Sequence, residues 1–373
     1  MTTTHFPSPP SLLSIQILRA VAALMVAIAH TRYEFEFKFG LGDAVPHMTG
    51  LAAGVDLFFV ISGFVMVYGS SYAFGQPGAP QDFIIRRLIR IVPLYWIATS
   101  VLLAHVLLNY PSLAAARQSV GTIIASYLFV PWPGPAGQMT PLLEQGWTLN
   151  YEMFFYLLFA VSLFARPRIA LIGLGLTLVL FVLVGPYFPL PPSLRYFANP
   201  LLYEFVFGMT IAAAYRWRPR LPTAAPHCLL AIGVAALTAT ILLFPEPSQR
   251  ALVWGVPAAL VVTGAVFAEN TFHPGPIGRR IGKFLGLLGD ASYALYLLHG
   301  FVHAAPRLLL GSIVEPARHP WLYMAFLISL SVTFSIVVHL IFERPLTRGL
   351  RRLVTGKSSS AAKAGLAGVG QRV

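Results

Sequence analysis

The sequence predicts an all-α integral membrane protein, a bundle of about ten transmembrane helices, and three observations lead to that class. Hydrophobic residues make up 57% of the 373 residues and charged residues only 10%, whereas soluble domains carry about 25% charged residues. The mean hydropathy is +0.72. Apolar stretches long enough to span a bilayer as a helix recur along the chain. A soluble fold is excluded, because so few charges cannot cover its surface.

Ten of these apolar stretches have the length of a membrane span. They cover residues 14–33, 50–69, 91–110, 147–165, 169–185, 198–215, 227–244, 251–269, 287–310 and 321–342. The apolar stretch at 120–130 is too short to cross a bilayer, so we predict that it is re-entrant or interfacial. The chain then divides into a cytoplasmic tail at 1–13, a membrane domain at 14–345 and a basic, disordered cytoplasmic tail at 346–373.

The positive residues predict the orientation of the bundle. The chain has 26 Lys and Arg against 13 Asp and Glu, a formal net charge of +13. If the N-terminus is inside, every inner loop carries a group of Arg or Lys residues, while the outer loops carry scattered ones. Positive residues collect in cytoplasmic loops. We therefore expect both termini in the cytoplasm, and membrane topology explains the charge better than a nucleic acid partner, which we do not predict.

Two ionisable residues lie on one face of the first span. Arg19 and His30 are eleven residues apart, which returns to nearly the same helix face about 16 Å along the axis. Arg19 is placed near the cytoplasmic end and His30 near the outer end. Each could have a structural role without function in catalysis: Arg19 as a snorkelling side chain, and His30 as a hydrogen-bonded interfacial residue. Together they indicate a functional groove.

Two carboxylates are predicted near the depth of His30. Asp56 and Glu152 lie within inward-running spans, each close to the outer leaflet, with Tyr156 one turn below Glu152. A carboxylate that orients an imidazole and stabilises its cation suits general-base catalysis. Either acid could instead form a structural ion pair or hydrogen bond. Gly63 shares the face of Asp56 and would allow close helix packing.

The ninth span carries one polar stripe. Ser292, Tyr296, His299 and His303 follow at i, i+4, i+7 and i+11 on an otherwise apolar helix. Such a stripe is expected to line a cavity rather than to face lipid, although these residues could also form interhelical hydrogen bonds. No spacing of the histidines requires a metal, and we predict none.

Arginines precede the third span on the inner side. Arg86 and Arg90 share a helix face, and Arg87 lies between them. Guanidinium groups in this arrangement suit a phosphate-bearing ligand. Anionic lipid headgroups or the positive-inside bias alone would explain them equally well.

With these residues in place, the chain resembles acyltransferase family 3, the membrane-bound O-acyltransferases that modify bacterial surface polysaccharides. Arg19 and His30 match the family's Arg–ten residues–His pattern on its first helix. The other matching segments are GVDLFFVISGF, RRLIRIVPLYW, GWTLNYEMFFY, LGDASYALYLLH and FERP, in this order along the chain. Within the family, the chain is most similar to the short exopolysaccharide O-acetyltransferases.

The resemblance implies an activity and a place in the cell. It implies an acyl-CoA co-substrate, usually acetyl-CoA, used from the cytoplasm, with no bound cofactor. It implies a carbohydrate hydroxyl as acceptor, the bacterial inner membrane as location, and polysaccharide biosynthesis proteins as possible partners. His30 would be the catalytic histidine, and Arg19 with the cytoplasmic arginines would bind the donor or guide its acyl group.

The main hypothesis is therefore acyl transfer from acyl-CoA to an envelope carbohydrate. Arg86, Arg87 and Arg90 would hold the CoA phosphates, and His30, oriented by Glu152 or Asp56, would act as base or acyl carrier. Two alternatives stay open: a transporter or flippase for a lipid-linked sugar, and an O-acyltransferase with a lipid or small-molecule acceptor.

Overall fold

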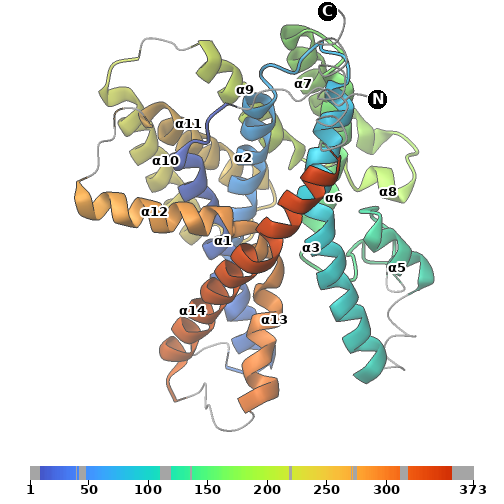
Figure 1. Cartoon of the computed structure of the whole chain (residues 1–373), viewed down its shortest axis with the longest axis vertical. Coiled ribbons are helices and arrows are strands. Elements are labelled where there is room, and N and C mark those ends of the chain that lie inside the picture. Colours follow the sequence, from blue (N-terminus) through green and yellow to red (C-terminus); the bar gives the residue numbers. More distant parts are fainter. Residues whose placement is uncertain are drawn as a thin grey trace, which may run out of the picture.

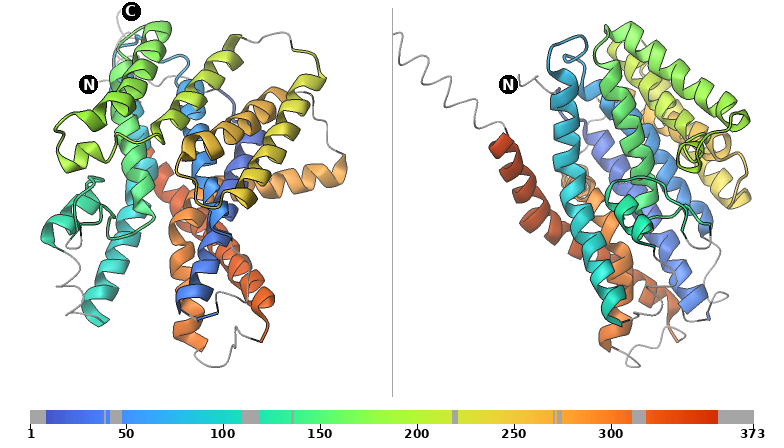
Figure 2. Two further views of the ribbon diagram at one scale, coloured as in Figure 1. Left: turned by 180° about the vertical axis from the view of Figure 1, so that it is seen from behind. Right: turned by 90° about the vertical axis from the view of Figure 1, so that its right-hand side faces the viewer.

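The computed structural model describes residues 9–38, 40–41, 48–109, 119–134, 137–217, 221–269, 271, 275–310 and 318–354. Within these ranges the chain is helical and contains no β-strand, which confirms the predicted all-α class. The long helices run side by side as a bundle (Figures 1 and 2). Of the predicted tails at 1–13 and 346–373, residues 1–8 and 355–373 lie outside the described residues.

The first half of the chain supplies the helices around the candidate site. They are α1 (Leu13–Tyr33), α2 (Gly54–Gly69), α3 (Ala79–Asn109), α5 (Val120–Tyr127), α6 (Gly146–Ser162) and α7 (Pro167–Val184). The second half adds α8 (Pro192–Arg195), α9 (Leu202–Trp217), α10 (Ala224–Leu243), α11 (Val256–Ala268), α12 (Pro276–Asp290), α13 (Ser292–Leu310) and α14 (Pro320–Val338). Short 3-10 or π-helical turns extend α1, α2, α11 and α14.

Most of the predicted spans correspond to helices of membrane length. Among the described residues, seven helical stretches are long and apolar enough to cross a bilayer, and the bent pair of α12 and α13 adds an eighth. The helices α6 and α9 occupy two further predicted spans but have only 17 and 16 residues. The short stretch at 120–130 forms α5, which is too short to cross. The chain is thus a multi-pass membrane protein.

Two helices extend beyond their predicted limits. The third predicted span began at residue 91, but α3 begins at Ala79, so Arg86, Arg87 and Arg90 belong to the helix itself. The last helical stretch runs over Pro320–Val354. The beginning of the segment 346–373, which the sequence predicted to be disordered, is therefore helical.

The start of the ninth predicted span was wrong. The apolar sequence suggested one helix over 287–310, but α12 and α13 meet at an angle of 70° and α13 begins at Ser292 (Figure 1). The reason lies in α12, which places Gly282, Gly286 and Gly289 on one face against α1. At Gly289 a side chain would collide with the backbone of Gln16 and would keep α12 away from α1. Packing on α1 therefore fixes the direction of α12 independently of α13.

The helices α2 and α9 approach closely through two glycines. A Cβ atom on Gly63 would collide with the Phe205 backbone, and one on Gly208 would collide with the carbonyl of Val60. Both glycines are needed because the two helix backbones touch. The predicted role of Gly63 in close helix packing is confirmed.

Candidate active site

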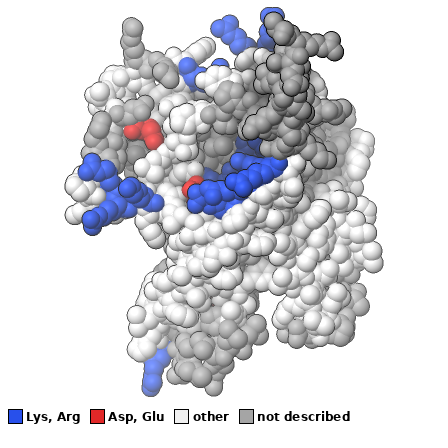
Figure 3. Space-filling view, in the orientation of Figure 1, with Lys and Arg blue, Asp and Glu red and all other residues white. Residues whose placement is uncertain are grey.

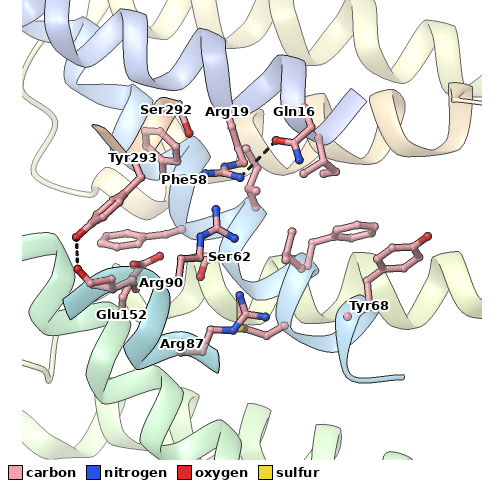
Figure 4. A pocket seen from close by; sticks show the side chains of 18 of the residues that line it. Gln16, Arg19, Phe58, Ser62, Tyr68, Arg87, Arg90, Glu152, Ser292 and Tyr293 are labelled. Atoms are coloured by element: carbon pink, nitrogen blue, oxygen red, sulfur yellow. Dashed lines mark hydrogen bonds between the residues drawn. The ribbon is translucent and has the colours of Figure 1, made fainter. Parts of the chain in front are cut away.

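A cavity of about 360 Å³ lies between α1, α2, α3, α6 and α13 (Figure 4). The structure brings most of the predicted site residues into its wall. These are Arg19, Arg86, Arg87, Arg90, Glu152, Tyr156, Ser292 and Tyr296. Pro9, Pro10 and Ser11, from the segment predicted to be a cytoplasmic tail, also line it. The cavity is therefore built from residues that are distant in the sequence but share one interior space.

The cavity is strongly basic. Figure 4 shows the guanidinium groups of Arg19, Arg87 and Arg90 directed into the same space. Arg19 donates a hydrogen bond to Gln16 at 3.3 Å. The Arg87 guanidinium lies 5.9 Å from the ring centre of Tyr156, close enough for a cation–π interaction. The positive charges are held by neighbouring side chains and are suited to an anionic ligand.

The position of Arg19 is fixed by the start of α1. The backbone amides of Leu13 and Ser14 both donate to the carboxylate of Glu269 at 2.8 Å. A carboxylate at a helix N-terminus satisfies free amide groups and complements the helix dipole. Gly289 of α12 also lies against the backbone of Gln16. Arg19, about one and a half turns after Ser14, is thereby held at the cavity wall.

Further arginines surround the mouth of the cavity. Arg86 forms an ion pair with Asp82 one turn earlier on α3. Arg351, from the helix that follows α14, also lines the cavity. In the sequence Arg351 looked like one more positive residue of the inner tail, and no pattern identified it as a site residue. On the face shown in Figure 3, Lys and Arg side chains gather over this part of the chain and along α12.

Glu152 does not lie at the depth that the sequence predicted. It lines the cavity with Arg19 and Arg90 instead of lying beside His30. The reason is the register of α6: its first residue, Gly146, packs against the ring of Tyr95, in the middle of α3. The helix therefore starts well inside the bundle, and six residues later Glu152 reaches the level of Arg90.

Asp56 also has a different partner from the predicted one. It is fully buried, and Arg250 donates to both of its oxygens, with Nε at 2.9 and 3.0 Å and Nη2 at 2.7 Å. Arg250 also donates to the Ala52 carbonyl, and its guanidinium lies 4.9 Å from the ring centre of Trp254. Burial opposes the charge of Arg250, but Asp56 outweighs it and raises the pKa of Arg250 above its usual value. Asp56 therefore connects α2 to the start of α11. In the sequence, the only indication of this ion pair was that Arg250 stands alone directly before the span predicted at 251–269.

Among the described residues, His30 lies against a second histidine and makes no hydrogen bond or ion pair with a carboxylate. The ring centres of His30 and His299 are 4.8 Å apart with an angle of 60° between the rings. His299 is completely buried on α13, with His303 on its other side at 5.5 Å. The polar stripe of the ninth span thus faces the interior, as predicted. Only its first two residues reach the cavity, since His299 is not among the described residues that line it.

Tyr296 stands between the cavity and this histidine pair. Its hydroxyl lies 2.8 Å from the Thr148 hydroxyl and donates to the Gln145 carbonyl at 3.2 Å. Its ring centre is 5.8 Å from that of Phe58 and 6.5 Å from that of His299. The site is therefore a basic cavity on one side of Tyr296, with two imidazoles on the other side.

Comparison with known proteins identifies what this arrangement is similar to. A family model described as an acyltransferase domain matches residues 12–340. The exopolysaccharide production protein ExoZ of Rhizobium meliloti (strain 1021) is 38% identical over 85% of this chain and 96% of its own length. The putative membrane-bound transacylase BcsY of Komagataeibacter xylinus is 27% identical over 88% of this chain and 81% of its own length.

A more distant relative is longer than this chain. The peptidoglycan O-acetyltransferase OatA of Listeria monocytogenes is 25% identical over 77% of this chain but only 48% of its own length. The similarity therefore covers about half of that relative. No solved structure matches this chain.

Proposed function

This chain belongs to the acyltransferase family whose domain matches residues 12–340, and from that premise we propose that it moves an acetyl group from acetyl-CoA to a hydroxyl of an exported polysaccharide. Its relatives make it a membrane O-acyltransferase, so the enzyme hypothesis prevails over the transporter hypothesis. The similarity to an exopolysaccharide production protein favours a carbohydrate acceptor over a lipid or a small molecule.

The observation that carries the proposed donor is the basic cavity. Arg19, Arg86, Arg87, Arg90 and Arg351 all line it, and Glu152 is the one carboxylate among its described lining residues. Guanidinium groups bind phosphates through paired, charge-assisted hydrogen bonds. CoA carries several phosphates at one end and the thioester at the other. In our proposal the outer arginines bind the phosphates, while Arg19 and Glu152 lie along the path of the acyl group.

The proposed orientation places this cavity at the cytoplasmic face of the bacterial inner membrane. Ten spans result when α6, α9 and the α12–α13 pair are counted with the seven longer helices. Both termini then lie in the cytoplasm, on the side where the chain carries most of its arginines. Acyl-CoA is made in the cytoplasm, so a donor cavity open to that side agrees with the charge distribution.

His30 is the proposed catalytic residue. Its Nδ1 lies 2.9 Å from the Val26 carbonyl, which can only accept a hydrogen bond. Nδ1 therefore carries the proton, and Nε2 has a free electron pair. This nitrogen can act by either of two routes: it can remove the proton of the acceptor hydroxyl, or it can take up the acyl group as a nucleophile. Both routes need the imidazole, so both predict that a variant without it is inactive.

The first experiment measures O-acyl groups on the envelope polysaccharide by NMR. Cells with the wild-type protein, with His30→Ala and with no protein are compared, and His105→Ala, at the outer half of α3, serves as a matched histidine control. We expect an acetyl signal with the wild type and with His105→Ala, and none in the other two samples.

Two results would contradict this proposal. A full signal with His30→Ala would exclude His30 from the reaction by either route. The absence of any difference among the samples, with each protein present in the membrane, would exclude a polysaccharide acceptor and direct the search to lipids and small molecules.

A further inference from the structure

Two imidazole rings lie against each other inside the bundle, although they come from helices far apart in the sequence. His30 belongs to α1 and His299 to α13, and their ring centres are 4.8 Å apart. His299 has no exposed surface, and its neighbours on α13 include the buried leucines Leu295, Leu297 and Leu298. A histidine at such a position requires an explanation. Burying its polar ring away from water costs free energy that an apolar side chain would not cost.

Both rings present the same kind of nitrogen. The Nδ1 of His299 lies 3.1 Å from the Leu295 carbonyl, just as the Nδ1 of His30 lies 2.9 Å from the Val26 carbonyl. Since carbonyl oxygens only accept hydrogen bonds, each Nδ1 donates and each Nε2 keeps a free electron pair. The Nε2 of His299 is buried and has no hydrogen-bond partner among the residues that the structure describes. A buried acceptor left unpaired destabilises the fold, so structure alone does not explain this residue.

The pair also lies in the right place for chemistry. Tyr296, one turn before His299 on α13, lines the donor cavity, and the Tyr296 and His299 ring centres are 6.5 Å apart. An acyl group that leaves the cavity past Tyr296 and Phe58 would meet His299 and His30 together. A second basic nitrogen is therefore available at the point where the acceptor hydroxyl must lose its proton.

We infer that His299 is the base that takes the acceptor's proton, while His30 carries the acyl group. This inference rests on the proposed function and chooses the second of its two routes. The reason is chemical: once Nε2 of His30 is bonded to the acyl carbon, its electron pair is used and it cannot act as a base. The neighbouring Nε2 of His299 can.

Acyl transfer then takes place in two steps. Nε2 of His30 attacks the thioester carbonyl, the carbon–sulfur bond breaks, and CoA leaves and takes up a proton to become the thiol. The acceptor oxygen then attacks the acyl carbon, its proton passes to Nε2 of His299, and the carbon–nitrogen bond to His30 breaks. His299 releases that proton to water, which balances the proton that CoA took up.

The test separates these two steps in the purified protein. Acetyl-CoA with a labelled acetyl group is added first, and both thiol release and label retained on the protein are measured. Polysaccharide whose O-acyl groups have been removed chemically is added second, and transfer of the label is followed. The variants are His30→Ala, His299→Ala and His299→Gln, with His303→Ala as a matched control one turn further along α13.

We expect both His299 variants to release thiol and retain label as the wild type does. Their transfer to polysaccharide should fall by about 10²–10⁴-fold, the usual contribution of a general base. His30→Ala should lose both steps, and His303→Ala should keep both. The glutamine variant fills most of the histidine volume, so a loss of transfer shared by both variants cannot come from a cavity.

Three outcomes would overturn the inference. The first is transfer at the wild-type rate in both His299 variants. The second is loss of thiol release in these variants as complete as in His30→Ala, which would show that His299 only holds His30 in place. The third is wild-type protein that transfers acetyl groups without ever retaining label. In that third case the proposed function stands and only the acyl–histidine route fails, whereas a wild type that uses no acetyl-CoA contradicts the proposed donor.

Discussion

At the scale of single residues, the ion pair of Asp56 and Arg250 shows how this bundle satisfies a buried carboxylate. The Asp56 side chain has no exposed surface, and Arg250 is about one quarter exposed, at 26%. The guanidinium donates to both carboxylate oxygens and to the Ala52 carbonyl. The carboxylate is therefore satisfied by its partner and has no need of His30.

Arg250→Met should destabilise the protein strongly. Removal of one partner leaves an unpaired buried charge, which costs about 3–5 kcal/mol of the free energy of unfolding. Asp56→Asn combined with Arg250→Met removes both charges and should cost less than Arg250→Met alone. Thermal unfolding in detergent measures both variants, and acyl transfer at low temperature should persist in the double variant. An unchanged unfolding temperature in Arg250→Met, or complete loss of transfer in the stable double variant, would contradict this structural role.

At the scale of helices, the contact of α2 with α9 depends on two missing side chains. Gly208→Leu would place a side chain where the Val60 carbonyl lies, so α9 would have to move away from α2. Glu204 and Phe205 pack from α9 toward α2 and would move with it. We expect Gly208→Leu to be recovered from membranes as aggregated or degraded protein.

The matched control is Gly173→Leu on α7. No atom of the described residues lies within 4 Å of the position that its Cβ would occupy. This variant should elute from a size-exclusion column in detergent as the wild type does. Equal yields of monodisperse protein from the two variants would show that the α2–α9 contact tolerates separation.

Helices also mark the limit of what the sequence could predict. Apolar length identified the membrane helices, and i, i+4 spacing correctly placed the polar stripe of Ser292 and Tyr296 toward the interior. Sequence could not reveal that α6 starts against Tyr95 inside the bundle, because that register depends on a contact between helices distant in sequence. The bend after Asp290 was missed for a similar reason: apolar residues continue from Leu287 into α13, and only packing of α12 on α1 requires a turn there. Of the candidate site, the residue types were predictable, but their pairing was not.

At the scale of the whole molecule, the charges are divided between two sides of Tyr296. The arginines Arg19, Arg87 and Arg90 line the proposed donor cavity, while the histidines His30 and His299 lie beyond Tyr296. In the proposed reaction an anionic donor is drawn to one end of the bundle, and the two imidazoles lie on the other side of Tyr296 and Phe58. This separation predicts that the donor is used from one side of the membrane only.

Sealed membrane vesicles of known orientation test that prediction. Acetyl-CoA is charged and does not cross a bilayer, so inside-out vesicles, which expose the cytoplasmic face, should release thiol when acetyl-CoA is added. Right-side-out vesicles should release it only after permeabilisation. Arg90→Ala should raise the KM for acetyl-CoA by about tenfold, the effect of losing roughly 1.4 kcal/mol of binding. Added salt should raise the wild-type KM more than that of the variant, because salt screens charges near the cavity mouth. Thiol release by intact right-side-out vesicles would instead place the donor cavity on the outer face, and it would reverse the orientation of the whole bundle.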